Sequence, residues 1–223
     1  MTHLDNEFIK LRMQLFEMWS LVISQVEMSR EALLNFDKGA ASEITFKEKM
    51  VDSYELKVDR DCENLIALNT PVATDLRFVL AVLKINTDLE RIGDFARGIA
   101  RFIKKCPKDN LNPELLKVCQ IDELMKNAIE MLTDAKKALE YENSRMAISI
   151  FSHDDFLDDV HKHSNKIIAE YIKSHPDEIE EALNLYSIIR KIERIGDHCN
   201  NIAEEIVFYL EAKVLKHSNK KKV

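Results

Sequence analysis

The sequence is short of the residues that bend a polypeptide chain. Its 223 residues include only 4 glycines and 4 prolines. A protein of this length built on β-strands needs many more turn residues, so the composition favours long helices. No apolar run approaches the roughly 18 residues that span a bilayer, and the polar residues at the start are unlike a secretory signal. We therefore predict an all-α cytoplasmic protein that associates with a membrane at most peripherally.

Cysteine and positive charge are also scarce. The 4 cysteines form no C-x-x-C pair, so we expect them to be reduced thiols. The formal net charge is −7, which argues against a nucleic-acid-binding protein because such a protein normally carries a basic stripe. Residues 217–223 form a small basic tail. We expect this tail to be frayed and solvated.

One helical unit is used twice. The hexapeptide Leu89–Asp94 recurs 103 residues later as Ile192–Asp197. Apolar residues around each copy are spaced alternately by three and four, which places them in one stripe along a helix that needs helical neighbours. The first stripe is Val82, Ile85, Leu89, Ile92, Ala96, Ile99 and Ile103, and the second is Leu185, Ile188, Ile192, Ile195, Cys199, Ile202 and Ile206.

Two further amphipathic segments precede each repeated helix. The nearer segment carries the stripe Ile44, Val51, Tyr54, Val58, Cys62 and Leu65 in the first half, and Ile150, Leu157, Val160, Ile168 and Tyr171 in the second. These two stripes are offset by 106 residues, and apolar segments lie farther upstream at 16–36 and 124–141. Three antiparallel helices with matched stripes cover one another. We therefore predict two tandem, internally repeated three-helix bundles with six long helices.

Prolines mark the boundaries of these units. Pro71 and Pro176 suit the starts of the repeated helices, because the N–H that proline lacks is not needed in a first helical turn. A segment with two prolines and two asparagines breaks the helical pattern between the halves. The predicted domains are residues 1–106 and 114–216, joined by the linker 107–113.

Acidic residues four positions apart occur on two helices of each half. The pairs are Glu48 with Asp52 and Glu90 with Asp94 in the first half, and Asp154 with Asp158 and Glu193 with Asp197 in the second. Counting 100° per residue places each pair on an exposed strip of its helix, away from the apolar stripe. Each bundle is therefore predicted to present two acidic pairs on adjacent helices.

These pairs are predicted to bind metal ions. Like charges four residues apart destabilise a helix by a few tenths of a kcal/mol. Crowding four carboxylates costs more unless a cation neutralises them. Oxygen ligands suit hard cations such as Mg²⁺, Ca²⁺, Mn²⁺ or iron. A solvated acidic face is the alternative for any single pair, and it is harder to maintain for four pairs at equivalent positions of a repeat. Arg91 and Arg194 are expected to be salt-bridge partners.

Gly93 and Gly196 occupy the same interior position of the two repeated helices. Glycine inside a helix costs about 1 kcal/mol relative to alanine. We expect a neighbouring helix or a ligand to approach each glycine closely. Inheritance of a harmless glycine by duplication is the alternative.

The signature segments of this chain resemble those of the PhoU family of phosphate-uptake regulators. They are Thr70–Arg77, Asp88–Asp94 and Ile192–Glu204, and the resemblance covers about residues 5–212 in both halves. It implies two three-helix bundles that bind metal, multinuclear iron in some members, through Glu/Asp-x-x-x-Asp motifs. These motifs fall on the eight carboxylates named above, with iron, Mn or Mg as the expected metals.

The resemblance also implies a function and partners. Members of the family repress the phosphate-starvation response and restrain uptake when phosphate is plentiful. They are thought to link the ATPase of the phosphate ABC transporter to a phosphate-sensing histidine kinase. A homodimer is expected, since many members form one.

Two other functions compete with this interpretation. A di-iron carboxylate enzyme needs Glu-x-x-His motifs on facing helices, and none of the 7 histidines follows a glutamate by three. We therefore expect no enzymatic activity. A helical interaction module with solvated acidic strips and no metal is the second alternative. No glycine-rich phosphate loop is visible, so the sequence does not support direct phosphate sensing.

Overall fold

The computed structural model describes residues 3–108 and 110–215, and every regular element within these ranges is a helix. The helices are α1 (His3–Asn35), α2 (Lys38–Asn69), α3 (Thr74–Lys105), α4 (Pro113–Val118), α5 (Ile121–Glu140), α6 (Ser144–Ser149), α7 (Phe151–Ser174) and α8 (Ile179–Glu211), with a 3-10 turn η1 at Pro176–Glu178. Six of them are long: α1, α2, α3, α5, α7 and α8. The predicted all-α fold with six long helices is confirmed. The basic tail 217–223 lies outside the described residues.

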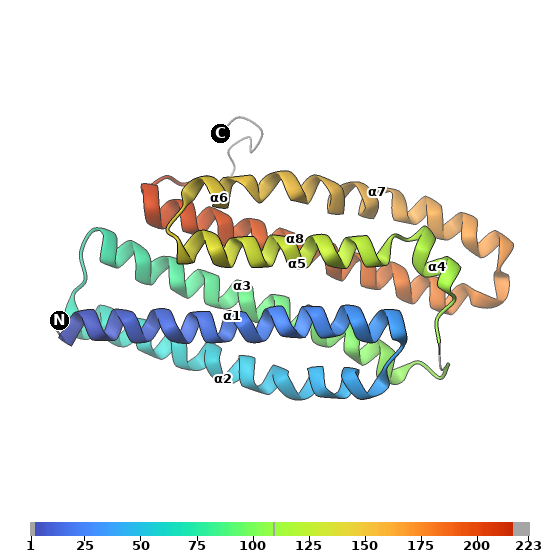
Figure 1. Cartoon of the computed structure of the whole chain (residues 1–223), viewed down its shortest axis with the longest axis horizontal. Coiled ribbons are helices and arrows are strands. Elements are labelled where there is room, and N and C mark those ends of the chain that lie inside the picture. Colours follow the sequence, from blue (N-terminus) through green and yellow to red (C-terminus); the bar gives the residue numbers. More distant parts are fainter. Residues whose placement is uncertain (1–2, 109, 216–223) are drawn as a thin grey trace.

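The helices form two bundles that lie side by side along their length (Figure 1). The first bundle consists of α1, α2 and α3, and the second is built on α5, α7 and α8. The repeated helices α3 and α8 pack against each other and run in opposite directions, while α1 packs against α5. The two halves of the chain therefore meet along two lines of helix contact.

The apolar stripes predicted from the sequence form the core. Every residue of the two stripes on α3 and α8 is buried, as is every residue of the stripe from Ile150 to Tyr171. On α2 the stripe is buried except for Tyr54, which is half-buried and donates a hydrogen bond from its hydroxyl to Glu17 Oε2 at 3.0 Å. Burying these faces against one another removes apolar surface from water, which is the main stabilising contribution.

The structure corrects several helix boundaries. Pro71 does not start α3, which begins at Thr74 after a turn in which Thr70 and Ala73 have φ angles of 44° and 48°. The predicted segment 124–141 corresponds to α5, but the short helix α4 precedes it, and the two are separated at Gln120, which has a φ of 52°. The short helix α6 precedes α7, which begins only at Phe151. The second half therefore contains additional short elements that the sequence pattern did not reveal.

Side-chain caps explain where some of these elements begin. The Asp37 carboxylate accepts hydrogen bonds from the backbone N–H groups of Gly39 and Ala40 at the start of α2. Asn112 accepts from the N–H of Glu114, so α4 begins at the last residue of the predicted linker. Each cap satisfies backbone donors that have no partner within the helix.

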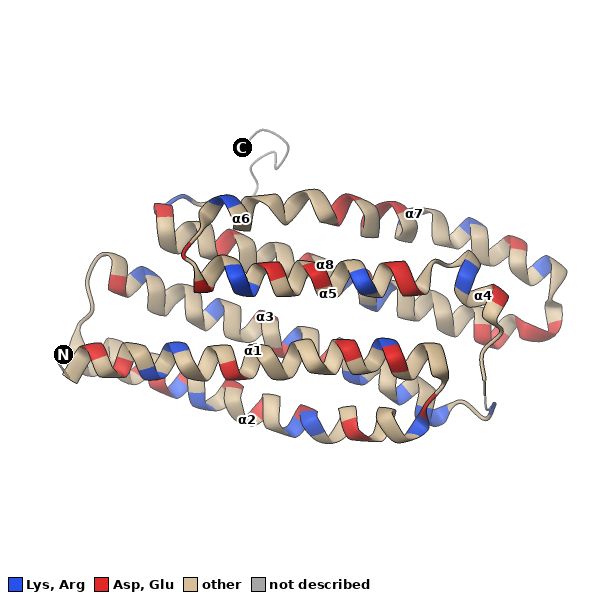
Figure 2. Cartoon of the chain, viewed as in Figure 1, with Lys and Arg blue, Asp and Glu red and all other residues tan. Residues whose placement is uncertain are grey.

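The surface carries both signs of charge. In Figure 2 acidic and basic positions interleave along α1 and α5, and a run of acidic positions marks the first half of α7. Among the described helices, none is long and apolar enough to cross a membrane. All 4 cysteines are free thiols, as predicted.

Candidate metal centres

The first group of predicted carboxylates lies where α2 faces α3. Glu48 and Asp52 come from α2, and Glu90 and Asp94 come from α3. Burial raises the pKa of both glutamates, and the negative charges of Asp94 and Asp52 raise it further. The structure therefore brings all four predicted residues of the first half into one electrostatic group.

Glu55 belongs to the same group, although the predicted pairs did not include it. It follows Asp52 by three residues on α2, a spacing that makes the two side chains neighbours on one helix face. Burial raises the pKa of Glu55, followed by the charges of Asp59 and Asp52. The Asp-x-x-Glu spacing was the signal that could have identified it. We call Glu48, Asp52, Glu55, Glu90 and Asp94 the first cluster.

Glu48 is buried, which corrects the expectation of an exposed strip. Its side chain is covered by α1, where Gln25 Nε2 donates a hydrogen bond to Glu48 Oε2 at 2.7 Å. The other oxygen, Oε1, is buried without a hydrogen-bond partner among the described residues. Burial raises the pKa of Glu48 to about 7. One hydrogen bond does not offset the hydration that an ionised carboxylate loses in this environment. A nearby cation would stabilise the ionised form.

Gly93 provides the space in which these groups meet. A Cβ at this position would lie 3.1 Å from Gln25 Oε1 and 3.2 Å from Glu48 Oε2. Both distances are shorter than an ordinary van der Waals contact, so any side chain would displace one of the two groups. The predicted close approach of a neighbouring helix to Gly93 is confirmed.

Arginines balance part of the negative charge on α3. Arg97 Nη2 forms an ion pair with Asp94 Oδ1, and Arg91 Nε lies 3.6 Å from Glu90 Oε2. The Arg91 pair agrees with the prediction, whereas Arg97 was not predicted. Its position three residues after Asp94 is the signal that the sequence offered. Both arginines are partly exposed, so water screens their contribution.

The second half repeats the arrangement on α7 and α8. Asp154 and Asp158 come from α7, and Glu193 and Asp197 come from α8. Burial raises the pKa of Glu193, followed by the charge of Asp197, and Asp158 acts in the same direction. Asp158 and Asp197 are exposed as predicted, whereas Asp154 and Glu193 are half-buried.

Asp154 lies against the second glycine. Asn200 donates a hydrogen bond from Nδ2 to Asp154 Oδ2. A Cβ on Gly196 would lie 3.0 Å from Asp154 Oδ1 and 2.5 Å from Leu157 Cδ1. The glycine is therefore required by packing in the second half as well, and it borders a predicted carboxylate in both copies.

His161 adds an imidazole to the second half. Its Nδ1 lies 3.4 Å from Glu193 Oε1. His161 follows Asp158 by three residues, as Glu55 follows Asp52, and it lies 106 residues after Glu55. A search for Glu-x-x-His missed it because the acidic residue is an aspartate. We call Asp154, Asp158, His161, Glu193 and Asp197 the second cluster.

The donor chemistry of the two clusters fits a cation, but the side chains do not already surround one. Carboxylate oxygens bind hard cations, and an imidazole adds affinity for iron or manganese. Within 3–108 and 110–215, no three acidic, histidine or cysteine side chains are arranged to hold one ion. A bound ion would have to draw these side chains inward. Metal binding at the eight predicted residues stays a prediction.

Comparison with known proteins identifies the family of the chain. The family profile described as the PhoU domain matches residues 15–103 and 121–206. The chain belongs to the PhoU family. Each matched stretch corresponds to one bundle and contains one complete cluster, so the internal repeat coincides with the PhoU domain.

Relatives of known name support the assignment to the PhoU family over nearly the whole chain. The chain is 28% identical to the phosphate-specific transport system accessory protein PhoU homolog 1 of Thermotoga maritima over 214 residues, which covers 96% of this chain and 91% of the relative. It is 29% identical to the accessory protein PhoU of Escherichia coli K12 over 213 residues, covering 96% and 87% of the two chains.

Solved PhoU structures share the fold. The crystal structure of PhoU from Pseudomonas aeruginosa superposes with a TM-score of 0.89 at 28% identity, covering 94% of this chain and 99% of that one. The phosphate transport system regulatory protein PhoU from Streptococcus pneumoniae gives 0.82 at 27% identity, covering 95% and 99%. The arrangement of the two bundles is therefore one already seen in this family.

Proposed function

We propose that this protein is a negative regulator of phosphate transport and of the phosphate-starvation response. Membership of the PhoU family supports this, together with relatives named as accessory and regulatory proteins of phosphate transport. The protein would act without catalysis in the cytoplasm, touching the membrane at most peripherally. Its partners would be the ATPase of the phosphate ABC transporter and a phosphate-sensing histidine kinase, with a homodimer as the active form.

Metal binding at the two clusters forms part of this proposal. The observation that carries it is the recurrence of a carboxylate cluster beside a helix glycine at equivalent positions of both halves. In the first cluster the ligands would be Asp52, Glu55, Glu90 and Asp94, with Glu48 behind them. In the second cluster they would be Asp154, Asp158, His161, Glu193 and Asp197. The ion would neutralise carboxylates whose charges otherwise repel one another across two helices.

The two clusters differ in a way that affects which metal binds. The first cluster offers only oxygen ligands, which suit Mg²⁺, Mn²⁺ or iron. His161 gives the second cluster an imidazole, and imidazole favours iron and manganese over magnesium. We therefore expect magnesium, if it binds, to prefer the first cluster, and transition metals to prefer the second.

Elemental analysis of purified protein tests the metal component. The protein would be prepared without chelators or a histidine tag, and its iron, manganese and magnesium contents measured by mass spectrometry. Asp94→Asn and Asp197→Asn should each lower the metal content, and the double variant should abolish it. Asp75→Asn provides the control, because Asp75 is an exposed residue of α3 outside the cluster. Unchanged metal content in the double variant would contradict metal binding at these clusters.

The regulatory component is tested separately in cells. Deleting the gene should leave phosphate-starvation genes expressed in high phosphate, and the wild-type gene should restore repression. Unchanged expression in the deletion strain would contradict the proposed function, whatever the metal content of the protein.

A metal-free helical interaction module is the second candidate. It is favoured by the ion pairs of Asp94 with Arg97 and of Glu90 with Arg91, which already balance part of the charge. If the protein contains no metal and the double variant still restores repression, this candidate replaces the metal-dependent one. The regulatory function itself would then be unaffected.

A further inference from the structure

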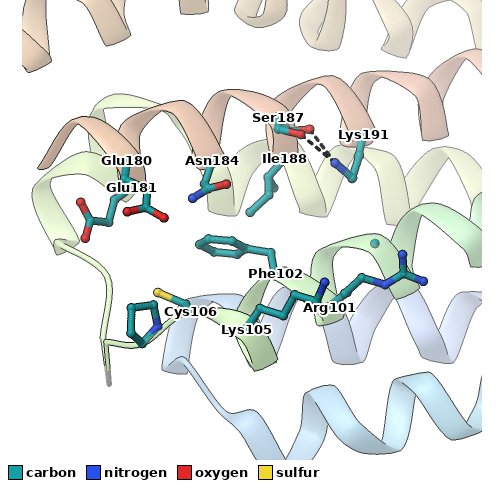
Figure 3. Close-up of a pocket in the computed structure, with 12 residues that line it drawn as sticks. Arg101, Phe102, Lys105, Cys106, Glu180, Glu181, Asn184, Ser187, Ile188 and Lys191 are labelled. Atoms are coloured by element: carbon teal, nitrogen blue, oxygen red, sulfur yellow. Dashed lines mark hydrogen bonds between the residues drawn. The ribbon is translucent and has the colours of Figure 1, made fainter.

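A cavity of about 420 Å³ opens where the last turns of α3 meet the first turns of α8 (Figure 3). The segment that leaves α3 at Cys106 and Pro107 borders it. The cavity lies on the α8 side of α3, whereas the first cluster lies on the α2 side of that helix. It is therefore separate from the proposed metal centres.

One end of the cavity is cationic. Arg101 and Lys105 extend into it from consecutive turns of α3, and Lys191 extends from α8. In Figure 3 these three side chains lie on the same side of the Phe102 ring. The side chains of Arg101 and Lys105 form no hydrogen bond or ion pair with any residue in the described part of the chain. Two side chains with unused donors therefore line the same end of the cavity as a third cation, Lys191.

Contacts with α8 and with Gly98 fix the position of the third cation, Lys191. Lys191 Nζ donates to Ser187 Oγ at 2.8 Å, and its aliphatic chain lies against Gly98, where a Cβ would be only 3.0 Å from Lys191 Cε. Burial lowers the pKa of Lys191, and the charge of Arg190 lowers it further. A bound anion would favour the protonated form of this amine.

The middle of the cavity is apolar and its far end is acidic. The Phe102 ring lies across the middle, opposite the buried side chain of Ile188. At the far end Glu181 Oε1 pairs with Lys108 Nζ at 2.5 Å. Its second oxygen, Oε2, is buried without a hydrogen-bond partner among the described residues. Glu180 lies beside it.

The order of these groups defines the class of ligand that fits. A single anionic group matches the cationic end, whereas a polyanion would also meet the carboxylates at the far end. A flat ring matches the aromatic side chain in the middle. An N–H donor matches the vacant acceptor Glu181 Oε2. The volume lies within the range of small-molecule sites and is far larger than inorganic phosphate requires.

We propose that this cavity binds a nucleoside monophosphate, with its phosphate on Arg101, Lys105 and Lys191, its base against Phe102, and a base N–H on Glu181. Ligand binding would bridge α3 and α8, which belong to different halves of the chain. It would therefore favour the arrangement in which the two halves are packed together. The site extends the proposed regulatory function and does not depend on metal binding.

Isothermal titration calorimetry on the full-length protein tests the proposal with AMP and GMP. Adenosine, ribose 5-phosphate and inorganic phosphate serve as partial ligands. At least one mononucleotide should bind more tightly than every partial ligand by about tenfold or more, because each partial ligand lacks one matched group. Arg101→Ala and Lys191→Ala should each weaken binding by about tenfold or more, and Phe102→Leu should weaken it by a smaller factor.

Lys104→Ala is the matched control, since Lys104 is an exposed lysine of α3 outside the cavity. Its affinity for the nucleotide should equal that of the wild type. Melting temperatures of all variants, measured without ligand, establish that each one folds. The proposal is overturned if neither nucleotide binds at millimolar concentration, or if inorganic phosphate binds as tightly as the nucleotides. It is also overturned if Arg101→Ala and Lys104→Ala have the same affinity.

Discussion

Single residues set how closely the helices of each half approach one another. Gly93 and Gly196 occupy equivalent positions, and in each copy the missing side chain leaves room for a carboxylate from the neighbouring helix. The two environments differ, since Gly93 faces polar atoms while Gly196 also faces the buried Leu157. A side chain at Gly93 should therefore affect stability differently from a side chain at Gly196.

Replacing Gly196 by alanine should destabilise the protein, whereas replacing Gly98 should not. A Cβ at position 196 would lie 2.5 Å from Leu157 Cδ1 in the core, and overpacking of this kind costs about 1–3 kcal/mol. This exceeds the gain of about 1 kcal/mol in helix propensity. At Gly98 the Cβ would meet only the flexible end of Lys191. Urea denaturation compares the two variants, and equal stabilities would contradict this account.

Glu48 should make the metal-free protein less stable as the pH rises from about 4.5 to about 7. The pKa of this carboxyl is 4.5 when it is fully solvated, as in the unfolded chain, and burial raises it to about 7 in the folded protein. Between these values the folded state binds more protons than the unfolded state, so the free energy of unfolding falls with rising pH. Each pKa unit corresponds to about 1.4 kcal/mol.

The variant Glu48→Gln measures this contribution. It should lose this part of the pH dependence and exceed the wild type in stability above pH 7, in chelator-treated protein followed by urea denaturation across the pH range. Glu63→Gln is the control, because Glu63 is an exposed residue of the same helix. Parallel pH profiles for wild type and Glu48→Gln would show that burial of this carboxyl has no such effect.

At the scale of helices, the sequence predicted the buried faces, because these depend on the local spacing of apolar residues. The stripe from Val82 to Ile103 is buried throughout, because a spacing of three and four is sufficient to define one helix face. The predicted start of α3 was wrong, because its position depends on a contact with a residue far away in the sequence. Arg77 Nε donates to the Tyr209 carbonyl at 3.2 Å, 132 residues away, and the preceding turn places Thr70 and Ala73 at positive φ. No pattern within the segment reveals such a contact.

In the candidate site, too, the residues that could be predicted are those defined by spacing within one helix. The acidic pairs on α2 and α3 were found from their spacing within each helix, and their equivalents in the second half followed from the repeat. The burial of Glu48 could not be predicted, because the residue that covers it, Gln25, belongs to α1. His161 was missed for a different reason, since the residue three positions before it is an aspartate and its equivalent in the first half, Glu55, is a different residue type.

The packing of α3 against α8 includes an ion pair with one buried partner. Lys84 Nζ lies 2.8 Å from Glu205 Oε2, and only 5% of the Glu205 side chain is exposed. Lys84→Met should therefore reduce the free energy of unfolding by about 1–3 kcal/mol, because a buried carboxylate loses this charged partner. Lys104→Met, an exposed change on the same helix, is the control. Equal stability of the two variants in urea would contradict this role.

In the whole molecule, the two halves are joined along both lines of helix contact. On the α3–α8 line, the ring centroids of Phe78 and Tyr209 are 5.2 Å apart. On the α1–α5 line, Arg30 pairs with Asp122 at 2.5 Å, and Trp19 Nε1 donates to the Leu132 carbonyl at 3.1 Å. Trp19 is fully buried. The contact between the halves is thus continuous with the core of each, unlike a polar interface between mobile domains.

Because of this continuity, the two halves should unfold together rather than separate first. Trp19 is the only tryptophan in the chain and contacts the opposite half, so its fluorescence reports their separation. The urea midpoint from fluorescence should coincide with the midpoint from far-UV circular dichroism, which follows helix content. Trp19→Phe should abolish the fluorescence change and so establish its origin. A fluorescence midpoint at lower urea than the helix midpoint would mean that the bundles part while still folded.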